Sequence, residues 1–143
     1  MSDCGVCLSY SGGDECTGYR RVIVHAGQRW ECDECGGVIS KRSLYELASG
    51  FNDGSHWQTK TCLICAEIAE AFYCGGRWHG SLWNSMEDVI TKLTTACFSR
   101  LQTPEAKAEL RRRWMDVMFN PINRDNLRRE FKDRLKLNSK PLV

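Results

Sequence analysis

The first part of the chain alternates short β-like runs with turn residues. Residues 19–25 (YRRVIVH) are rich in β-branched and aromatic side chains and end at an Ala-Gly pair, after which residues 28–31 can return as a partner strand. Residues 38–61 hold a second pair of such runs around the sequence Asn-Asp-Gly at 52–54, where Asp-Gly can supply the positive φ angles of a tight turn. The pattern predicts two short β-hairpins.

Helical periodicity follows. Residues 62–73 (CLICAEIAEAFY) place apolar side chains at near-helical spacing and are followed by two glycines, which predicts a short helix. From residue 84 onward the spacing is helical throughout, with apolar stripes that indicate three further helices. They are expected to begin at Ser85, at Thr103-Pro104 and at about Asn123. The stripe of the last helix is narrow.

Cysteine usage divides the chain near residue 80, because eight of the nine cysteines come earlier. We therefore expect a cysteine-rich module over residues 1–83 and a helical, basic region over residues 84–143, packed together as one compact α+β unit. The first module is predicted to be a small zinc-stabilised, treble-clef-like fold of two short β-hairpins and a helix. The second is predicted to be a three-helix C-terminal part.

Composition and charge narrow the class of protein. With 143 residues and 42% hydrophobic side chains, the composition is that of a folded globular domain rather than a disordered chain. A run long enough to span a membrane and a signal-peptide pattern are both missing, so we expect a soluble, cytoplasmic protein in which structural disulfides are disfavoured. Residues 1–103 hold 9 basic and 12 acidic side chains, whereas residues 104–143 hold 11 and 6. Polyanion binding would therefore depend on the C-terminal region.

The strongest chemical signal is a pair of Cys-x-x-Cys motifs. Cys32 and Cys35 are followed by Cys62 and Cys65, and two such pairs suit one tetrahedral four-cysteine zinc site. Two glycines after the first pair fit a zinc knuckle, and the second pair falls at the start of the predicted helix. The order of knuckle, hairpin and helix N-terminus is that of a treble clef. A redox dithiol would need only one of the two pairs.

A second zinc ion is expected at the N-terminal cysteines. Cys4 and Cys7 form a third pair, and we predict that Cys74 and His79 complete a Cys3His site because the two glycines after Cys74 allow the chain to turn back. Cys16 is the substitute ligand. A frayed N-terminus with unligated thiols is the alternative. The remaining candidates, His25, His56 and Cys97, are interpreted as surface or packing residues and, for Cys97, a core residue.

Several of these motifs resemble those of a known group of proteins. The runs WECDECGGVI at 30–39, NDGSHWQTKTCLIC at 52–65 and CGGRWHG at 74–80, together with Tyr45, resemble a group of small cysteine-rich proteins encoded by bacteriophages and prophages. The resemblance spans roughly residues 4–90 and supports metal roles for the cysteines and histidine of both predicted sites. It implies a phage origin but no settled biochemical function, and the basic tail lies outside it.

Catalysis is not expected. Four cysteine ligands close the coordination sphere, and the zinc-deaminase motif, the P-loop and the Gly-rich dinucleotide motif are all missing from the sequence. We therefore predict a protein that binds and modulates a host protein or nucleoprotein complex, such as an inhibitor of a host defence system. The alternative is a zinc-finger regulator that binds nucleic acid. The five tryptophans suit interface anchors and equally suit a small core.

The protein-binding and the nucleic-acid-binding interpretation both place the contact with the partner in the C-terminal region. Its cations can pair with phosphates, although interspersed acidic residues also allow intrahelical ion pairs on a solvated face. Its narrow apolar stripe can dock on a groove. The candidate partner-binding residues are Arg111, Arg112, Arg113, Arg124, Leu127, Arg128, Arg129, Phe131 and Arg134.

Overall fold

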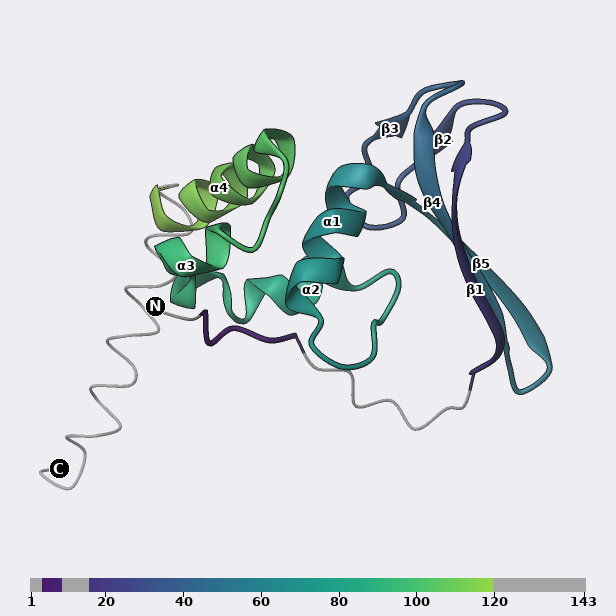
Figure 1. Cartoon of the computed structure of the whole chain (residues 1–143), viewed down its shortest axis with the longest axis horizontal. Helices are drawn as coiled ribbons and strands as arrows, with labels where there is room; N and C mark the ends of the chain where they lie inside the picture. Colours follow the sequence, from purple (N-terminus) through teal and green to yellow (C-terminus); the bar gives the residue numbers. More distant parts are fainter. Residues whose placement is uncertain (1–3, 9–15, 120–143) are drawn as a thin grey trace, which may run out of the picture.

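The computed structural model describes residues 4–8 and 16–119 and shows a mixed α+β fold. A three-stranded antiparallel sheet has the order β1-β4-β5, with β1 at Cys16–His25, β4 at Leu44–Asn52 and β5 at Ser55–Cys62. Helices lie beside one face of this sheet, and α4 lies farther from the sheet than α1 (Figure 1). The central strand β4 is the most buried of the three, as its neighbours on both sides require.

One of the two predicted hairpins is confirmed. Strands β4 and β5 pair from Tyr45↔Cys62 to Asn52↔Ser55, and the turn between them has φ angles of 51° at Asp53 and 80° at Gly54. An Asp-Gly turn with two positive φ angles matches the right-handed twist of the strands that it joins.

The other predicted hairpin, of residues 19–25 with residues 28–31, is wrong. Strand β1 pairs with β4 along its length, from His25↔Leu44 to Cys16↔Asn52. The segment after β1 instead forms its own small ribbon, in which β2 (Trp30–Glu31) pairs with β3 (Val38–Ile39). The tight turn over residues 32–37 returns the chain at once, so β2 meets β3 and the long strand β1 is left to pair with β4.

The predicted helix at 62–73 is confirmed, because α1 spans Leu63–Phe72. The apolar stripe after Ser85 is not one helix. It is divided into α2 (Leu82–Glu87), a 3-10 turn at Ile90–Lys92 and α3 (Thr95–Phe98), and the chain is extended at Leu93, where ψ is 136°. The β-branched side chains of this stretch lose rotamer freedom in a helix, which favours the interruption.

The next helix, α4, spans Pro104–Phe119 and begins where Thr103-Pro104 predicts. The Thr103 hydroxyl accepts a hydrogen bond from the Ala106 N–H at 3.2 Å, which satisfies a donor at the helix start. The Glu67 carboxylate of α1 accepts bonds from the N–H groups of Gln102 and Thr103, and so ties α4 to α1. The third predicted helix, from about Asn123, lies outside the described residues.

The hydrophobic core draws on both predicted segments. Phe72 and Ile68 of α1 are fully buried together with Met86, Leu101 and Leu110 from beyond residue 83. Residues 1–83 and 84–143 therefore share one core wherever the structure describes them. Among the described helices, none combines the length and the apolar character needed to cross a membrane.

Two disulfides tie the N-terminal segment to this core, which corrects the expectation that disulfides are disfavoured. Leu8 donates a backbone hydrogen bond to the Phe72 carbonyl at 2.7 Å and forms an isolated parallel bridge with Tyr73, and the neighbouring residues Cys7 and Cys74 are bonded to each other. Cys4 is bonded to Cys97, which is buried as predicted but is not a free core thiol.

The shared core predicts a stability effect for α4. Leu110→Ala should lower the free energy of unfolding by about 2–5 kcal/mol, because the Leu110 side chain is fully buried where α4 packs in the core. Met115→Ala on the same helix is the matched control, since Met115 is 48% exposed and exposed substitutions usually change stability by less than about 0.5 kcal/mol. Chemical denaturation measures both. Equal midpoints would show that α4 does not belong to the core.

Candidate metal centre

The first Cys-x-x-Cys pair lies in a tight turn that links β2 to β3. The Cys32 N–H donates to the Gly37 carbonyl at 2.8 Å, and the Gly36 N–H donates to the Cys32 carbonyl at 2.8 Å. Gly36 has a φ of 74°, a conformation that glycine adopts without a steric penalty. The turn brings the Cys32 and Cys35 thiols to the same cluster, as the sequence predicts.

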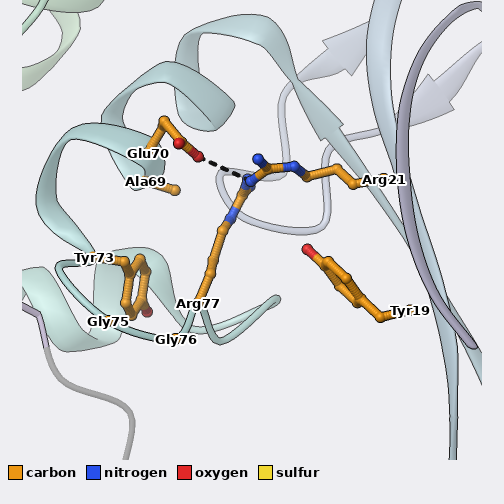
Figure 2. A pocket seen from close by; sticks show the side chains of 8 residues that line it. All are labelled: Tyr19, Arg21, Ala69, Glu70, Tyr73, Gly75, Gly76 and Arg77. Carbon is orange, nitrogen blue, oxygen red and sulfur yellow. Dashed lines mark hydrogen bonds and ion pairs between the residues drawn. The ribbon is translucent and has the colours of Figure 1, made fainter. Parts of the chain in front are cut away.

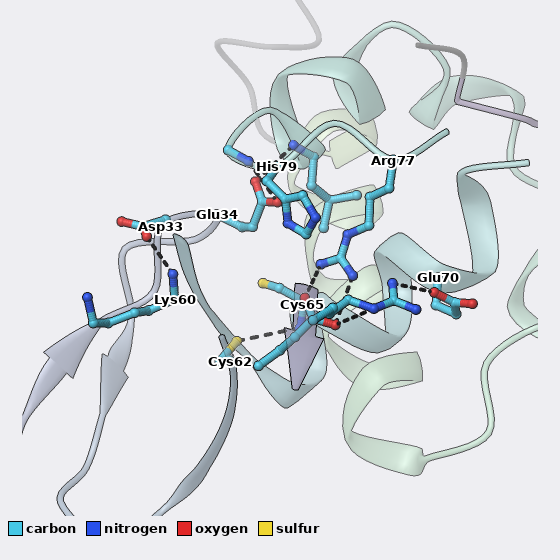
Figure 3. Close-up of polar contacts among 12 residues, drawn as sticks. Asp33, Glu34, Lys60, Cys62, Cys65, Glu70, Arg77 and His79 are labelled. Carbon is cyan, nitrogen blue, oxygen red and sulfur yellow. Dashed lines mark hydrogen bonds and ion pairs between the residues drawn. The ribbon is translucent and has the colours of Figure 1, made fainter. Parts of the chain in front are cut away.

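The second pair lies where β5 passes into α1. Cys62 is the last residue of β5 and the N-cap of α1, and its sulfur accepts a hydrogen bond from the Cys65 N–H at 3.5 Å. Cys65 is in the first turn, where unpaired backbone N–H groups and the helix dipole favour negative charge. Figure 3 shows both cysteines at this junction.

The four sulfurs of Cys32, Cys35, Cys62 and Cys65 lie within 4.8 Å of one another. A tetrahedral site with metal–sulfur bonds of about 2.3 Å has sulfur–sulfur edges of about 3.8 Å, and the Cys35 and Cys62 sulfurs are 3.9 Å apart. Cys32 and Cys65 are buried, while Cys35 and Cys62 are half-buried. This cluster can hold one metal ion through four thiolates.

Each sulfur also receives at least one N–H donor, and such donors stabilise thiolates by spreading their negative charge. Two backbone N–H groups point at Cys32, and one points at each of Cys35 and Cys62. The fifth donor is the indole of Trp83. The bonds are Glu34 N to Cys32 Sγ, Cys62 N to Cys32 Sγ, Gly37 N to Cys35 Sγ, Cys65 N to Cys62 Sγ and Trp83 Nε1 to Cys65 Sγ, at 3.3–3.5 Å.

The metal-free cluster would not carry four charges. Hydrogen bonds from Cys62 and Cys65 lower the pKa of Cys32. The hydrogen bond with Cys32 raises the pKa of Cys62 to about 12, and the hydrogen bonds with Cys32 and Cys62 raise the pKa of Cys65 above its ordinary value. Without metal, Cys32 is then the thiolate, and hydrogen bonds from the Cys62 and Cys65 thiols stabilise it. A metal cation supplies the positive charge that lets the remaining thiols ionise as ligands.

Trp83 connects the cluster to the helical region and was missed by the sequence analysis. Its indole N–H donates to Cys65 Sγ at 3.4 Å, and the Arg113 guanidinium lies 3.8 Å from the centre of its ring. Arg113 in turn pairs with Glu109 on α4 at 2.9 Å. Nothing in the local spacing of Trp83 indicates a cysteine partner 18 residues earlier.

Two acidic residues of the turn over residues 32–37 tie it to other elements by hydrogen bonds. The Asp33 carboxylate accepts the Lys60 N–H of β5 at 2.7 Å (Figure 3). The Glu34 carboxylate accepts the N–H groups of Gly80 and Leu82 at 3.1 and 3.0 Å, which fixes the start of α2. Burial raises the pKa of Glu34, although these two hydrogen bonds oppose the shift.

The predicted second zinc site is not assembled. Residues 4–8 alternate between buried and exposed positions, so Cys4 points inward and Cys7 outward, whereas a zinc knuckle needs both sulfurs on one side. Cys4 and Cys7 are instead bonded to Cys97 and Cys74. The His79 ring accepts or donates one hydrogen bond with the Tyr19 hydroxyl at 2.8 Å. Cys16, the substitute ligand, is an exposed free thiol.

Only part of the predicted partner-binding set falls in the described residues. Arg111, Arg112 and Arg113 lie on α4, and two of them pair with Glu109 of the same helix, Arg112 across three residues and Arg113 across four. The pair of the exposed Arg112 matches the solvated-face interpretation, whereas Arg113 also lies over the Trp83 ring. The other members, Arg124, Leu127, Arg128, Arg129, Phe131 and Arg134, lie outside the described residues.

Comparison of the chain with models of protein families, with curated proteins and with solved structures finds no match. The interpretation of the four-cysteine cluster as a metal centre rests on its geometry and on the chemistry of its sulfurs.

The cluster predicts one metal ion per chain. Cys62→Ser should abolish metal binding and unfold the protein, because binding to a four-cysteine site supplies folding free energy on the order of 10 kcal/mol. Cys16→Ser is the matched control, and Cys4→Ser should also retain the metal because Cys4 is in a disulfide. Elemental analysis and thermal unfolding measure these outcomes. Two metal ions in the unmodified protein would contradict the disulfide pairing.

The hydrogen bond from the Trp83 indole to Cys65 predicts a partial loss of metal affinity when it is removed. Trp83→Phe keeps an aromatic ring under Arg113 but removes the N–H donor to Cys65, so metal affinity should fall by about 10- to 100-fold. Trp114→Phe on α4 is the matched control. Competition with a chromophoric chelator measures both affinities. An equal loss in the two variants would show that the effect is one of packing rather than of the hydrogen bond.

Proposed function

We propose that the chain is a non-enzymatic zinc-binding protein, encoded by a phage or prophage, that binds and modulates a protein or nucleoprotein complex of a bacterial host. An inhibitor of a host defence complex is one example. The zinc module would be treble-clef-like, with the turn at 32–37 as its knuckle and α1 as its helix.

The observation that carries this proposal is the closed four-sulfur cluster. Soft thiolate ligands in a tetrahedral arrangement favour zinc. Four protein sulfurs leave the ion without an open position for water or substrate, and catalytic zinc requires such a position. A metal in this cluster would hold the fold together and present surfaces for binding.

A protein partner is favoured by a groove between β1 and α1. This cavity of about 440 Å³ has Ile23, 53% exposed, and Leu63, 41% exposed, on its wall. Three carboxylates, of Glu46, Glu67 and Glu70, share the lining with the guanidinium of Arg21. Arg21, the cation among the described lining residues, is already paired with Glu70, so the exposed apolar side chains suit a protein surface and the groove disfavours a polyanion.

Nucleic acid remains the second candidate because residues 104–143 carry 11 basic side chains against 6 acidic ones. Arg112 and Arg113 are engaged with Glu109, so phosphate contact would depend on Arg111 and on the arginines after residue 120.

The two candidates predict opposite responses of the C-terminal region. Immobilised protein should retain a specific host protein after nuclease treatment and at moderate salt, because an apolar contact is only weakly screened. Phe131→Ala should reduce this retention more than Arg128→Ala, since a buried aromatic anchor contributes more than a rim charge. Quantitative mass spectrometry of the retained proteins makes the measurement.

A chain truncated after Asn120 is the control for folding and should keep its metal. Retention that is lost with nuclease and that falls steeply with salt would favour the nucleic-acid regulator, because each neutralised phosphate releases counterions.

A further inference from the structure

The two edges of the three-stranded sheet differ in whether their backbone groups are bonded. The edge formed by β5 is covered by the turn over residues 32–37. There the Lys60 N–H donates to the Asp33 carboxylate at 2.7 Å, and the Lys60 carbonyl accepts the Asp33 N–H at 2.8 Å. The Cys62 N–H donates to Cys32 Sγ at 3.3 Å. The opposite edge is β1, and its outer backbone groups have no counterpart to this cover among the described residues.

The pairing of β1 with β4 identifies which backbone groups of β1 face outward. The Ala26 N–H donates to the Ser43 carbonyl at 2.8 Å, so Ala26 directs its backbone toward the β4 side. In an antiparallel pair this direction alternates along the strand, and Val24 and Val22 therefore bond to β4 as well. The residues between them direct their N–H and C=O groups at the outer edge. They are Arg21, Ile23 and His25.

The outer edge of β1 is free and regular. Within the part of the chain that the structure describes, no residue hydrogen-bonds to these outward backbone groups. The register shift between β1 and β4 lies before Arg20, so the pairing is regular from Arg20 to His25. Residues 22–24 (VIV) carry neither a charge nor a proline, two features by which edge strands resist pairing. The edge is therefore a template of unpaired donors and acceptors to which another strand can add.

The groove between β1 and α1 lies beside this edge, since Arg21 and Ile23 line it. On the helix side, Leu63, Glu67 and Glu70 recur every three or four residues and so share one face of α1. Figure 2 shows the Arg21 guanidinium directed at Glu70, and the two are paired at 2.9 Å. Side chains of an added strand would alternate between the two faces of the sheet, so every second one would lie over the groove.

The groove has an apolar part and an acidic part. Ile23 and Leu63 are 53% and 41% exposed, so an apolar side chain placed against them would bury surface that is now in water. Glu67 lies one turn further along α1, and its carboxylate accepts hydrogen bonds from the neutral residues Gln102 and Thr103. Two residues of a strand advance about 7 Å and one turn of helix about 5 Å. A lysine or arginine two residues along the added strand would therefore complement the charge of Glu67.

We propose that an extended segment of a partner protein adds to the free edge of β1 as a fourth strand, with an apolar side chain against Ile23 and Leu63 and a lysine or arginine beside Glu67. The inference rests on the proposed function in that it takes a protein as the partner. A second copy of the chain is a poorer occupant, because the cation that its own β1 presents on this face, Arg21, is already paired with Glu70.

Residue-resolved hydrogen exchange on the full metal-bound chain tests whether the edge is free. The amides of Val22 and Val24 should be protected by β4, and the amides of Ile23 and His25 should exchange at least about 10-fold faster. Equal protection of the two sets would overturn the proposal, because the chain's own residues or a second copy would then already cover the edge. Sedimentation of the same sample distinguishes these two occupants.

A displayed library of random nine-residue peptides supplies the probe for binding. Peptides selected on the full metal-bound chain should alternate β-branched or aromatic residues with other residues, and they should be enriched in lysine or arginine. N-methylation of one alternate set of amides in a selected peptide should weaken binding by about 10-fold or more, because that set bonds to β1. N-methylation of the other set is the matched control and should have little effect. Replacement of the basic residue by glutamate should weaken binding by about 2- to 5-fold.

Variants of β1 test the same contact from the side of the chain. Ile23→Pro removes one outward N–H at a position where an edge strand tolerates proline, and it should weaken peptide binding by about 10-fold or more. Ile23→Val keeps the N–H and the β-branched shape and should bind within about 2-fold of the unmodified chain. Met115→Ala on α4 should change nothing. Metal content and melting temperature confirm that each variant is folded, and the N-methylated peptides leave the chain unchanged.

The proposal is overturned if the library yields no binder, if both N-methylated peptides bind equally well, or if the selected peptides are acidic. A host protein that the Ile23→Pro chain retains as well as the unmodified chain does would overturn this inference and leave the proposed function standing. Peptides that need the β1 edge, in a chain that retains no host protein, would support this inference and contradict the proposed function.

Discussion

Four cysteine sulfurs from two distant parts of the chain converge at one point, and this convergence fixes how the sheets meet the first helix. Cys32 and Cys35 come from the turn between β2 and β3, and Cys62 and Cys65 come from the junction of β5 with α1, so the cluster joins the two β-sheets to the first helix. The indole of Trp83 extends this connection to α2. Thiolates confined this closely repel one another, and a bound cation removes that repulsion.

A buried ion pair provides a second connection, between the sheet and the loop after α1. Glu46 on the central strand is 5% exposed, and it is compensated by Arg77, which approaches it at 2.7 Å. The pair holds the loop over the sheet, where Trp78 and His79 of the loop line a cavity of about 390 Å³ together with residues of the three strands.

Features set by neighbouring residues could be predicted from the sequence. The Asp-Gly turn at 53–54, the helix that begins after Cys62 and the start of α4 at Pro104 are all specified within a few positions. The four cysteines of the cluster could be predicted to converge because each pair has its own Cys-x-x-Cys spacing. Features that depend on distant partners were not. The pairing of β1 with β4, the bond of Cys4 to Cys97 and the contact of Trp83 with Cys65 are fixed by packing that no local pattern encodes.

The central claim is that the four sulfurs form one closed metal centre around which the chain folds. X-ray absorption spectroscopy at the zinc edge, on protein purified without chelator, tests this claim directly because it reports the number and type of ligand atoms. The account predicts one zinc per chain with four sulfur neighbours at about 2.3 Å and no nitrogen or oxygen in the first shell. A shell that contains nitrogen or oxygen, or a folded protein that contains no metal, would contradict it.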